Sequence, residues 1–251
     1  MTYTSTNPLL ANLNNLYLEY IGLIVLLSTV GVLLGIAGHF VIIGPNAKRL
    51  GKLKPEIVRL TPFERTAHFV RMLSFIILAV TGIAFALFHV GTLGLSYVAA
   101  YKIHLVFAAL FTLSSLNSIF IWLKDSIFKT YDRDWFKVMG GYLTRKEIHP
   151  PSGRFNAGQK AFYWFSTFFS ILIIFSGLML AYPGKFGLNS LLWASVLHGI
   201  SAIGLIAGVI AHAYLGSLAN PGTIGTIIHG KVSREWAKNH HPQWFEEIEQ
   251  K

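Results

Sequence analysis

Two histidines, His198 and His212, lie fourteen residues apart in one apolar segment of the chain. An α-helix turns about 100° and rises about 1.5 Å per residue, so this spacing brings both imidazoles to nearly one face, roughly 21 Å apart along the axis. Imidazole is an axial ligand of haem iron, and an apolar segment of this length can cross a bilayer. The spacing therefore predicts two stacked metal cofactors on one membrane helix, with two haems as the expected occupants.

The composition of the chain places these histidines in a membrane protein. Hydrophobic residues make up 53% of the 251 residues and charged residues 13%, against about 25% charged residues in a soluble domain. The chain has ten histidines and no cysteine. Without cysteine this chain can form no disulfide, no thiolate-ligated iron–sulfur cluster and no c-type haem attachment, so imidazole ligation is favoured.

Five apolar segments reach the length of about 20 residues that a membrane-spanning helix needs. They predict an all-α integral membrane protein, in which a four-helix di-haem bundle is preceded by one extra N-terminal helix. The expected spans are Tyr17–Ile43, Pro62–Phe88, Ser96–Leu123, Lys160–Tyr182 and Ser190–Leu218.

The remaining segments divide the chain into three expected regions. Residues 1–60 form an N-terminal extension with one membrane helix and a basic cytoplasmic linker. Residues 61–219 form the four-helix core, with a cytoplasmic loop at 125–158, and residues 220–251 form a cytoplasmic tail. The first apolar run is too long for a signal peptide and has no Lys or Arg before it, so we expect a retained helix. Thr61, Pro62 and Glu64 predict a capping box at the start of the second span.

The distribution of Lys and Arg predicts the orientation of the five spans. With the N-terminus outside, only Lys102 and Lys185 of the 21 Lys and Arg residues fall outside the membrane. The positive-inside rule therefore predicts a periplasmic N-terminus and a cytoplasmic C-terminus. The same rule explains the net charge of +10 without a nucleic-acid partner.

Counting inward from the expected helix ends pairs four histidines by depth. His104 and His198 fall near the outer face, and His68 and His212 fall near the inner face. Two such bis-histidine layers predict an outer and an inner haem b, whose six-coordinate iron suits electron transfer. A single membrane histidine is often a packing residue or part of a proton path, but four that pair by depth favour haem ligation.

The other basic side chains have less specific interpretations. His39 and His89 lie near helix ends, and we expect them at the membrane interface. Arg65 and Arg71 flank His68 and are candidates for contacts with haem propionates or a quinone headgroup, with a positive-inside anchor as the alternative. Four further histidines are expected to be solvated or to face a partner: His149, His229, His240 and His241.

Five stretches of the sequence form a set of motifs. They are Phe63-Glu64-Arg65-Thr66-Ala67-His68, Arg154-Phe155-Asn156-Ala157-Gly158-Gln159-Lys160, His198-Gly199, Ala211-His212-Ala213-Tyr214, and Gly230-Lys231-Val232-Ser233-Arg234-Glu235-Trp236-Ala237-Lys238 followed by His240-His241-Pro242. Over about residues 59–249, this set resembles the cytochrome b (gamma) subunits of membrane-bound formate dehydrogenases, a family of di-haem membrane anchors. The first sixty residues depart from the four-helix members by adding a helix.

The resemblance implies the cofactors and partners of the chain. It implies two b haems, ligated at His68, His104, His198 and His212. It implies a complex with an iron–sulfur beta subunit and a catalytic alpha subunit that holds a molybdenum or tungsten pterin. It also implies that menaquinone is reduced near the inner haem, beside Asn156, Gly158, Gln159 and His212.

The residues themselves are compatible with that quinone site. Asn156 and Gln159 precede the fourth span on the cytoplasmic side, where His212 is also expected. Amide side chains and the free N–H groups of a helix N-terminus can bond a quinone carbonyl. The alternative is structural, with Asn156 as a helix cap and Gly158 as a turn residue.

We therefore expect a membrane-anchor subunit of a formate:quinone oxidoreductase of the bacterial inner membrane, and not the formate-oxidising subunit itself. Electrons would pass from a periplasmic-side iron–sulfur subunit through two b haems to menaquinone, or another quinone, near the cytoplasmic side. The cytochrome b of a nickel-iron hydrogenase or of a thiosulfate or polysulfide reductase is an alternative. A haem-free anchor or transporter is another.

Overall fold

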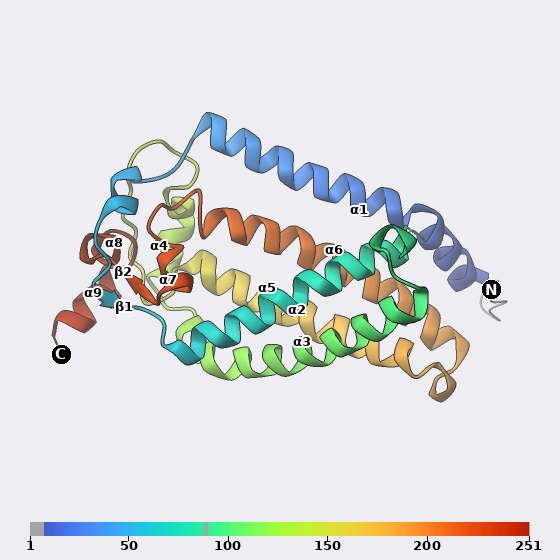
Figure 1. Ribbon diagram of the computed structural model, residues 1–251. Coiled ribbons are helices and arrows are strands. Elements are labelled where there is room, and N and C mark those ends of the chain that lie inside the picture. The colour runs from blue at the N-terminus through green and yellow to red at the C-terminus, as the bar shows by residue number, and fades with distance from the viewer. Residues whose placement is uncertain (1–7, 88–89, 251) are drawn as a thin grey trace. The chain divides into compact units, whose positions relative to one another are not determined.

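Five long helices dominate the computed structural model, which describes residues 8–87 and 90–250. Within these residues, five helices are long and apolar enough to cross a membrane, which confirms the predicted all-α membrane fold (Figure 1). The expected interfacial residue His89 lies outside the described residues. The long helices are α1 (Pro8–Ile42), α2 (Pro62–Ala86), α3 (Tyr97–Ser126), α5 (Ala157–Ala181) and α6 (Leu188–Leu215).

The start of α1 is the largest difference between the expected and observed spans. The helix begins at Pro8, nine residues before the expected Tyr17, because three asparagines interrupt the apolar run and hide the first turns from a hydropathy reading. Proline is common at the first helical position, where its missing N–H costs no hydrogen bond. Within this polar stretch Asn14 is buried, whereas Asn12 and Asn15 are exposed.

The chain forms two compact units, each assembled from parts of the same long helices. The first unit contains Met1–Val32, Val70–Ser115 and Ser166–Gly208, and the second contains Leu33–Phe69, Leu116–Phe165 and Val209–Lys251. His104 and His198 fall in the first unit, whereas His68 and His212 fall in the second. Each unit therefore contains one of the two histidine pairs expected from depth.

Small side chains pack the helices of the first unit. Such residues let membrane helices approach closely, because lipid supplies no hydrophobic drive for their association. A Cβ added to Gly199 on α6 would lie 2.7 Å from ring carbons of Tyr17 on α1, so only glycine admits this ring. The extra helix α1 thus packs against α6 at the residue next to His198. Buried small residues of this unit include Ser74, Thr81, Ala84, Ala100, Ser114, Ser115, Ser166, Thr167, Ser170, Ser176, Ala194 and Ser201.

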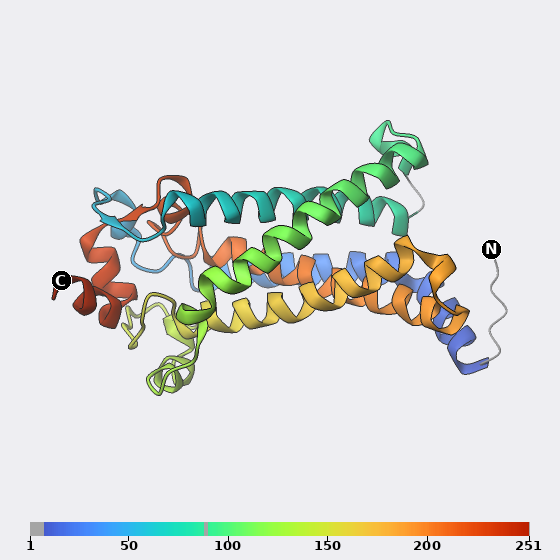
Figure 2. The ribbon, with the colours of Figure 1, turned by 90° about the horizontal axis from the view of Figure 1, so that it is seen from below.

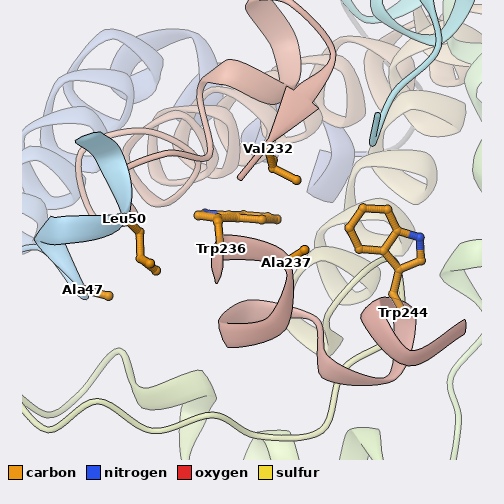
Figure 3. Packing of buried hydrophobic residues seen from close by; sticks show 6 residues of the cluster. All are labelled: Ala47, Leu50, Val232, Trp236, Ala237 and Trp244. Atoms are coloured by element: carbon orange, nitrogen blue, oxygen red, sulfur yellow. The ribbon is translucent and has the colours of Figure 1, made fainter. Parts of the chain in front are cut away.

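The second unit combines helix ends with a folded cap, by which we mean residues 44–60, 127–156 and 216–250. In the cap, β1 (Ile57–Val58) pairs antiparallel with β2 (Lys231–Val232). Figure 1 labels α8 and α9 beside these strands, and Figure 2 shows the same red C-terminal helices after a turn of 90°. The linker and the tail share one core of Ala47, Leu50, Val232, Trp236, Ala237 and Trp244 (Figure 3). Its short helices are α4 (Asp132–Lys137), α7 (Gly225–Ile228), α8 (Arg234–His240), α9 (Pro242–Glu249), η1 (Lys48–Lys52) and η3 (Met139–Gly141). In the first unit, η2 (Val90–Leu93) and η4 (Pro183–Lys185) lie between long helices.

The start of α2 confirms the predicted capping box. The Glu64 amide N–H donates to Thr61 Oγ1 at 3.2 Å, and the Thr61 amide N–H donates to Glu64 Oε2 at 2.8 Å. Pro62 is the first residue of the helix. These bonds satisfy two donors that a helix N-terminus otherwise leaves unpaired, and they fix the start of the helix that carries His68.

Candidate functional site

The first unit brings His104 of α3 and His198 of α6 together. Their ring centroids are 6.4 Å apart. A bond from a first-row metal to an imidazole nitrogen is about 2.0 Å, and that nitrogen lies about 1.1 Å from its ring centroid, so two axial imidazoles on one iron have centroids about 6 Å apart. The His104–His198 pair therefore has the spacing that a single haem iron requires.

Hydrogen bonds fix the tautomer of both rings in this pair. The hydroxyl of Thr81 has one hydrogen, which it donates to the Ile77 carbonyl at 2.7 Å, so Thr81 Oγ1 accepts from His104 Nδ1–H at 2.7 Å. His198 Nδ1 lies 3.2 Å from the Ile173 carbonyl oxygen, which can only accept. Both rings thus carry their hydrogen on Nδ1 and keep the Nε2 lone pair for a metal, the arrangement typical of ligating histidines.

Gly177 of α5 provides the space for the His198 ring. A Cβ at this position would lie 3.1 Å from His198 Cε1 and 3.5 Å from Nδ1. Cε1 lies between the two ring nitrogens, so an alanine here would press on the ring beside both Nδ1 and Nε2. Glycine at residue 177 therefore sets the position of the imidazole.

The second unit brings His68 of α2 and His212 of α6 together in the same way. Their ring centroids are 6.5 Å apart. Phe162 of α5 stacks on His212, with centroids 4.2 Å apart and planes 8° apart, and Trp122 of α3 lies 6.5 Å from the His68 ring. This pair also matches the spacing of two axial imidazoles and is lined by aromatic rings. The sequence reasoning missed Phe162, although its place one turn after Gln159 puts it on the same helix face.

The donor set fits a haem better than a metal held by protein ligands alone. Each pair supplies two imidazoles, and within residues 8–87 and 90–250 no three His, Cys, Asp or Glu side chains gather as a metal site. A zinc ion or a non-haem iron needs three or more protein ligands, whereas a porphyrin supplies four nitrogens itself. Two facing imidazoles between apolar helices are therefore the complete protein contribution that a b haem requires.

The candidate quinone residues form the N-terminus of α5. Asn156 Oδ1 accepts from the Gln159 amide N–H at 2.9 Å, and Gln159 Oε1 accepts from the Asn156 amide N–H at 3.1 Å. This reciprocal cap is the structural alternative that the sequence left open for Asn156. A Cβ at Gly158 would lie 2.6 Å from the Trp135 ring, so Gly158 admits that ring. This reciprocal interaction uses the side-chain oxygens of Asn156 and Gln159, so their side-chain NH2 groups remain as the possible donors to a ligand.

An ionic cluster joins α2, α3 and the residues before α5 in the second unit. Arg154 donates to Asp125 Oδ2 at 2.6 Å, to Glu64 Oε1 at 2.6 Å and to the Arg59 carbonyl at 2.7 Å. Burial lowers the pKa of Arg154, but hydrogen bonds and the charges of Asp125 and Glu64 outweigh it and raise that pKa above its usual value. Because Glu64 lies one turn before His68, this cluster anchors the helix end that carries His68.

His241 corrects one of the sequence-based expectations. We expected it to be solvated or partner-facing, but it is 1% exposed. Its Nδ1–H donates to the Gly153 carbonyl at 2.7 Å, and its Nε2 accepts from Arg59 Nη2 at 3.0 Å. Burial, followed by the charge of Arg59, holds the pKa of His241 well below its usual value, so the ring is neutral at pH 7. Trp236 covers both side chains, with its ring 4.7 Å from Arg59 Cζ and 5.0 Å from the His241 ring.

The other candidate basic residues occupy different surroundings. Arg65 donates to the carbonyls of Ile227 and Ile228 in the cap. In the first unit, Arg71 donates to Ser170 Oγ at 3.1 Å. His39 of α1 donates from Nε2 to the Tyr142 carbonyl at 2.7 Å and accepts from the Tyr214 hydroxyl at 2.6 Å, so both of its ring nitrogens are used. His149 and His229 are exposed, as expected, and His240 is half-buried.

The part of the chain that contains all four paired histidines matches a known protein family. Residues 59–230 match the family model described as prokaryotic cytochrome b561. The chain belongs to this family. A cytochrome b binds haem b, so family membership independently supports the interpretation of the histidine pairs as haem ligands.

Individual relatives of the chain are named as formate dehydrogenase subunits. The chain is 29% identical over 204 residues to the formate dehydrogenase cytochrome b556(fdo) subunit of Escherichia coli (strain K12), covering 78% of this chain and 95% of the relative. It is 34% identical over 100 residues to the nitrate-inducible cytochrome b556(Fdn) subunit of the same strain, covering 39% and 46%. The cytochrome b556 subunit of Haemophilus influenzae formate dehydrogenase is 31% identical over 99 residues, covering 38% and 41%. These relatives confirm the resemblance to cytochrome b subunits of formate dehydrogenases.

Proposed function

We propose that this chain is the di-haem cytochrome b anchor subunit of a respiratory formate dehydrogenase complex in a bacterial inner membrane. The observation that carries the proposal is the pair of bis-histidine sites at 6.4 and 6.5 Å in a member of a cytochrome b family. The likeness to the fdo subunit over 95% of its length supports formate dehydrogenase as the complex. The proposed partners are an iron–sulfur beta subunit and an alpha subunit with a molybdenum or tungsten pterin.

Each histidine pair has a separate role in the proposal. His104 and His198 hold the outer haem b, and His68 and His212 hold the inner haem b. When bound, the two haems supply one-electron relay sites on the path from the iron–sulfur partner to a quinone. Hydrogen bonds at Nδ1 hold the rings of the outer pair in one tautomer, and aromatic rings pack against the inner pair, which favours electron transfer over ligand exchange.

The proposed orientation follows from charge. The positive-inside rule places the N-terminus in the periplasm and the cap in the cytoplasm. The outer pair then faces the electron-donating partner, and the inner pair lies near the side from which protons reach the quinone. Arg65 and Arg71 remain proposed contacts of haem propionates or of a quinone headgroup.

The proposed site of menaquinone reduction lies between the N-terminus of α5 and His212. Phe162 stacks on His212 at 4.2 Å and lies one turn beyond Gln159 on the same helix. This contact supports a site that includes Asn156, Gly158, Gln159 and His212. Amide N–H donors there can bind the quinone carbonyls and neutralise the charge that develops as they are reduced.

The test is purification of the chain with its partners after mild detergent extraction. We expect b-type absorbance that formate reduces and that added menaquinone analogue reoxidises. A preparation whose b-type absorbance responds to hydrogen or a sulfur compound, and not to formate, would reject formate dehydrogenase as the complex. Absence of any b-type absorbance would reject the cytochrome role itself.

A further inference from the structure

Arg59 is a buried cation without a carboxylate partner. The residue is 4% exposed, and in the part of the chain that the structure describes it forms no ion pair. Its Nη2 donates to the Arg154 carbonyl at 2.9 Å, to Gln159 Oε1 at 3.2 Å and to His241 Nε2 at 3.0 Å. Its buried Nε has no hydrogen-bond partner among the described residues. Burying a charge among neutral acceptors is costly, so this position calls for an explanation other than stability.

The tail holds this guanidinium in place. The Trp236 ring lies over Arg59 Cζ at 4.7 Å, and the neutral His241 accepts one of its hydrogens. Trp236 and His241 belong to the folded tail, whereas Gln159 belongs to the first turn of α5. Arg59 therefore links the tail to the helix end at which the proposed quinone site begins.

Two donors converge on the side-chain oxygen of Gln159. The Arg59 guanidinium approaches Oε1 at 3.2 Å and the Asn156 amide N–H approaches it at 3.1 Å. Both are donors only, so the amide cannot turn its nitrogen toward them without losing both bonds. The amide is fixed with its NH2 group directed away from Arg59, and no described residue accepts a hydrogen bond from Gln159 Nε2.

We propose that Arg59 is a positioning residue of the quinone site, which fixes the Gln159 amide so that its NH2 group donates to a quinone carbonyl. The proposal rests on the proposed function. The ligand recognised is a carbonyl oxygen that becomes more basic as it is reduced. The buried positive charge behind the amide strengthens that donor toward a more negative oxygen, because the surroundings screen it poorly.

The test compares variants of the purified complex, with haem content, donor reduction of the haems and steady-state kinetics with a menaquinone analogue as readouts. Gln159→Glu keeps the oxygen, and its carboxylate pairs with Arg59, but it removes the NH2 donor. We expect both haems and their reduction by formate to be retained, while the KM for the analogue rises about tenfold, as a lost hydrogen bond predicts. Arg59→Gln should raise the KM about fivefold, and Arg59→Lys, which keeps a donor, should restore part of it.

The control is Arg133→Gln, which removes the same charge from an exposed residue and should leave the KM unchanged. Combining Arg59→Gln with Gln159→Glu should raise the KM no further than Gln159→Glu alone, because the two residues act in series.

Unchanged kinetics in Gln159→Glu and Arg59→Gln, with an active unmodified complex, would overturn the Arg59 role and leave the proposed function standing. Loss of the inner haem or a shift of its potential in Arg59→Gln, with an unchanged KM, would assign Arg59 to the haem instead. An unmodified complex that reduces its haems but no quinone would reject the proposed function, and the Arg59 role with it.

Discussion

Replacing Thr81 with valine tests whether the hydrogen bond behind His104 tunes a haem ligand. Valine keeps the shape of threonine but removes the oxygen that accepts from His104 Nδ1–H at 2.7 Å. The site is shielded from water by the helices, so the donor left behind has no ready replacement, and its loss costs about 1–3 kcal/mol. Outer-shell partners of ligating histidines typically change metal affinity by about 10–100-fold. We therefore expect weaker haem retention at the His104–His198 pair.

The same substitution has an expected direction on the reduction potential. A hydrogen bond from Nδ1–H makes the imidazole a stronger electron donor, which favours the oxidised iron. Loss of the hydrogen bond should raise the midpoint potential of one haem. The rise is about 60 mV if the equilibrium constant between oxidised and reduced haem shifts tenfold toward the reduced form. An optical redox titration of the purified complex, with haem content measured in parallel, gives both quantities.

The matched control for Thr81→Val is Thr112→Val on α3. Thr112 bonds the Ala108 carbonyl at 2.8 Å, so the control loses a similar helix hydrogen bond away from the imidazole. Thr81→Ser, which keeps the hydroxyl, should behave as the unmodified chain. A Thr81→Val complex with unchanged haem content and potential, or an equal shift in Thr112→Val, would refute the reasoning.

Three further changes test the packing around the sites. Lys160→Met leaves Asp132 as an unpaired buried charge, because Lys160 Nζ lies 2.7 Å from Asp132 Oδ2 and both side chains are 2% exposed. We expect the free energy of unfolding to fall by about 3–5 kcal/mol, which a lower Tm would show. An unchanged Tm would contradict the structural role of the pair. Gly177→Ala places a Cβ 3.1 Å from His198 Cε1 and should lower haem occupancy and alter the b-type spectrum; a native spectrum at full occupancy would show that the ring has room. His241 has a depressed pKa, so it contributes stability above about pH 6.5 that is lost as the pH falls below that value. His241→Gln should therefore weaken the increase in tail proteolysis between pH 7 and pH 5, and an equal increase in both proteins would contradict this source of acid sensitivity.

The long helices and the histidine pairs could be predicted because each depends on a short-range pattern. Apolar length gives the spans, and residues per turn give the facing of His198 and His212. The capping box at Thr61 and Glu64 is likewise a local motif. The start of α1 lies nine residues before the predicted one, because the asparagines there lower the hydropathy of a stretch that is nevertheless helical, with Asn14 buried.

The details of the site depend on segments far apart in the sequence. His241 is expected to be solvated or partner-facing because it lies in the cytoplasmic tail, yet Arg59, 182 residues earlier, and Trp236 pack against it. The stacking of Phe162 on His212 joins two helices whose mutual rotation no single helix pattern determines. Such contacts follow from tertiary packing, which is why the sequence indicated the histidine pairs but not the groups that position them.

The number of haems per chain tests the central claim most directly. Pyridine haemochrome analysis of the purified complex should give two haem b per copy of this chain. His104→Ala or His198→Ala should leave one haem, and His68→Ala or His212→Ala should leave the other, distinguished by potential and by whether formate still reduces it. A complex with no haem b in this chain, or four alanine variants that each retain two haems, would contradict the assignment of the two histidine pairs.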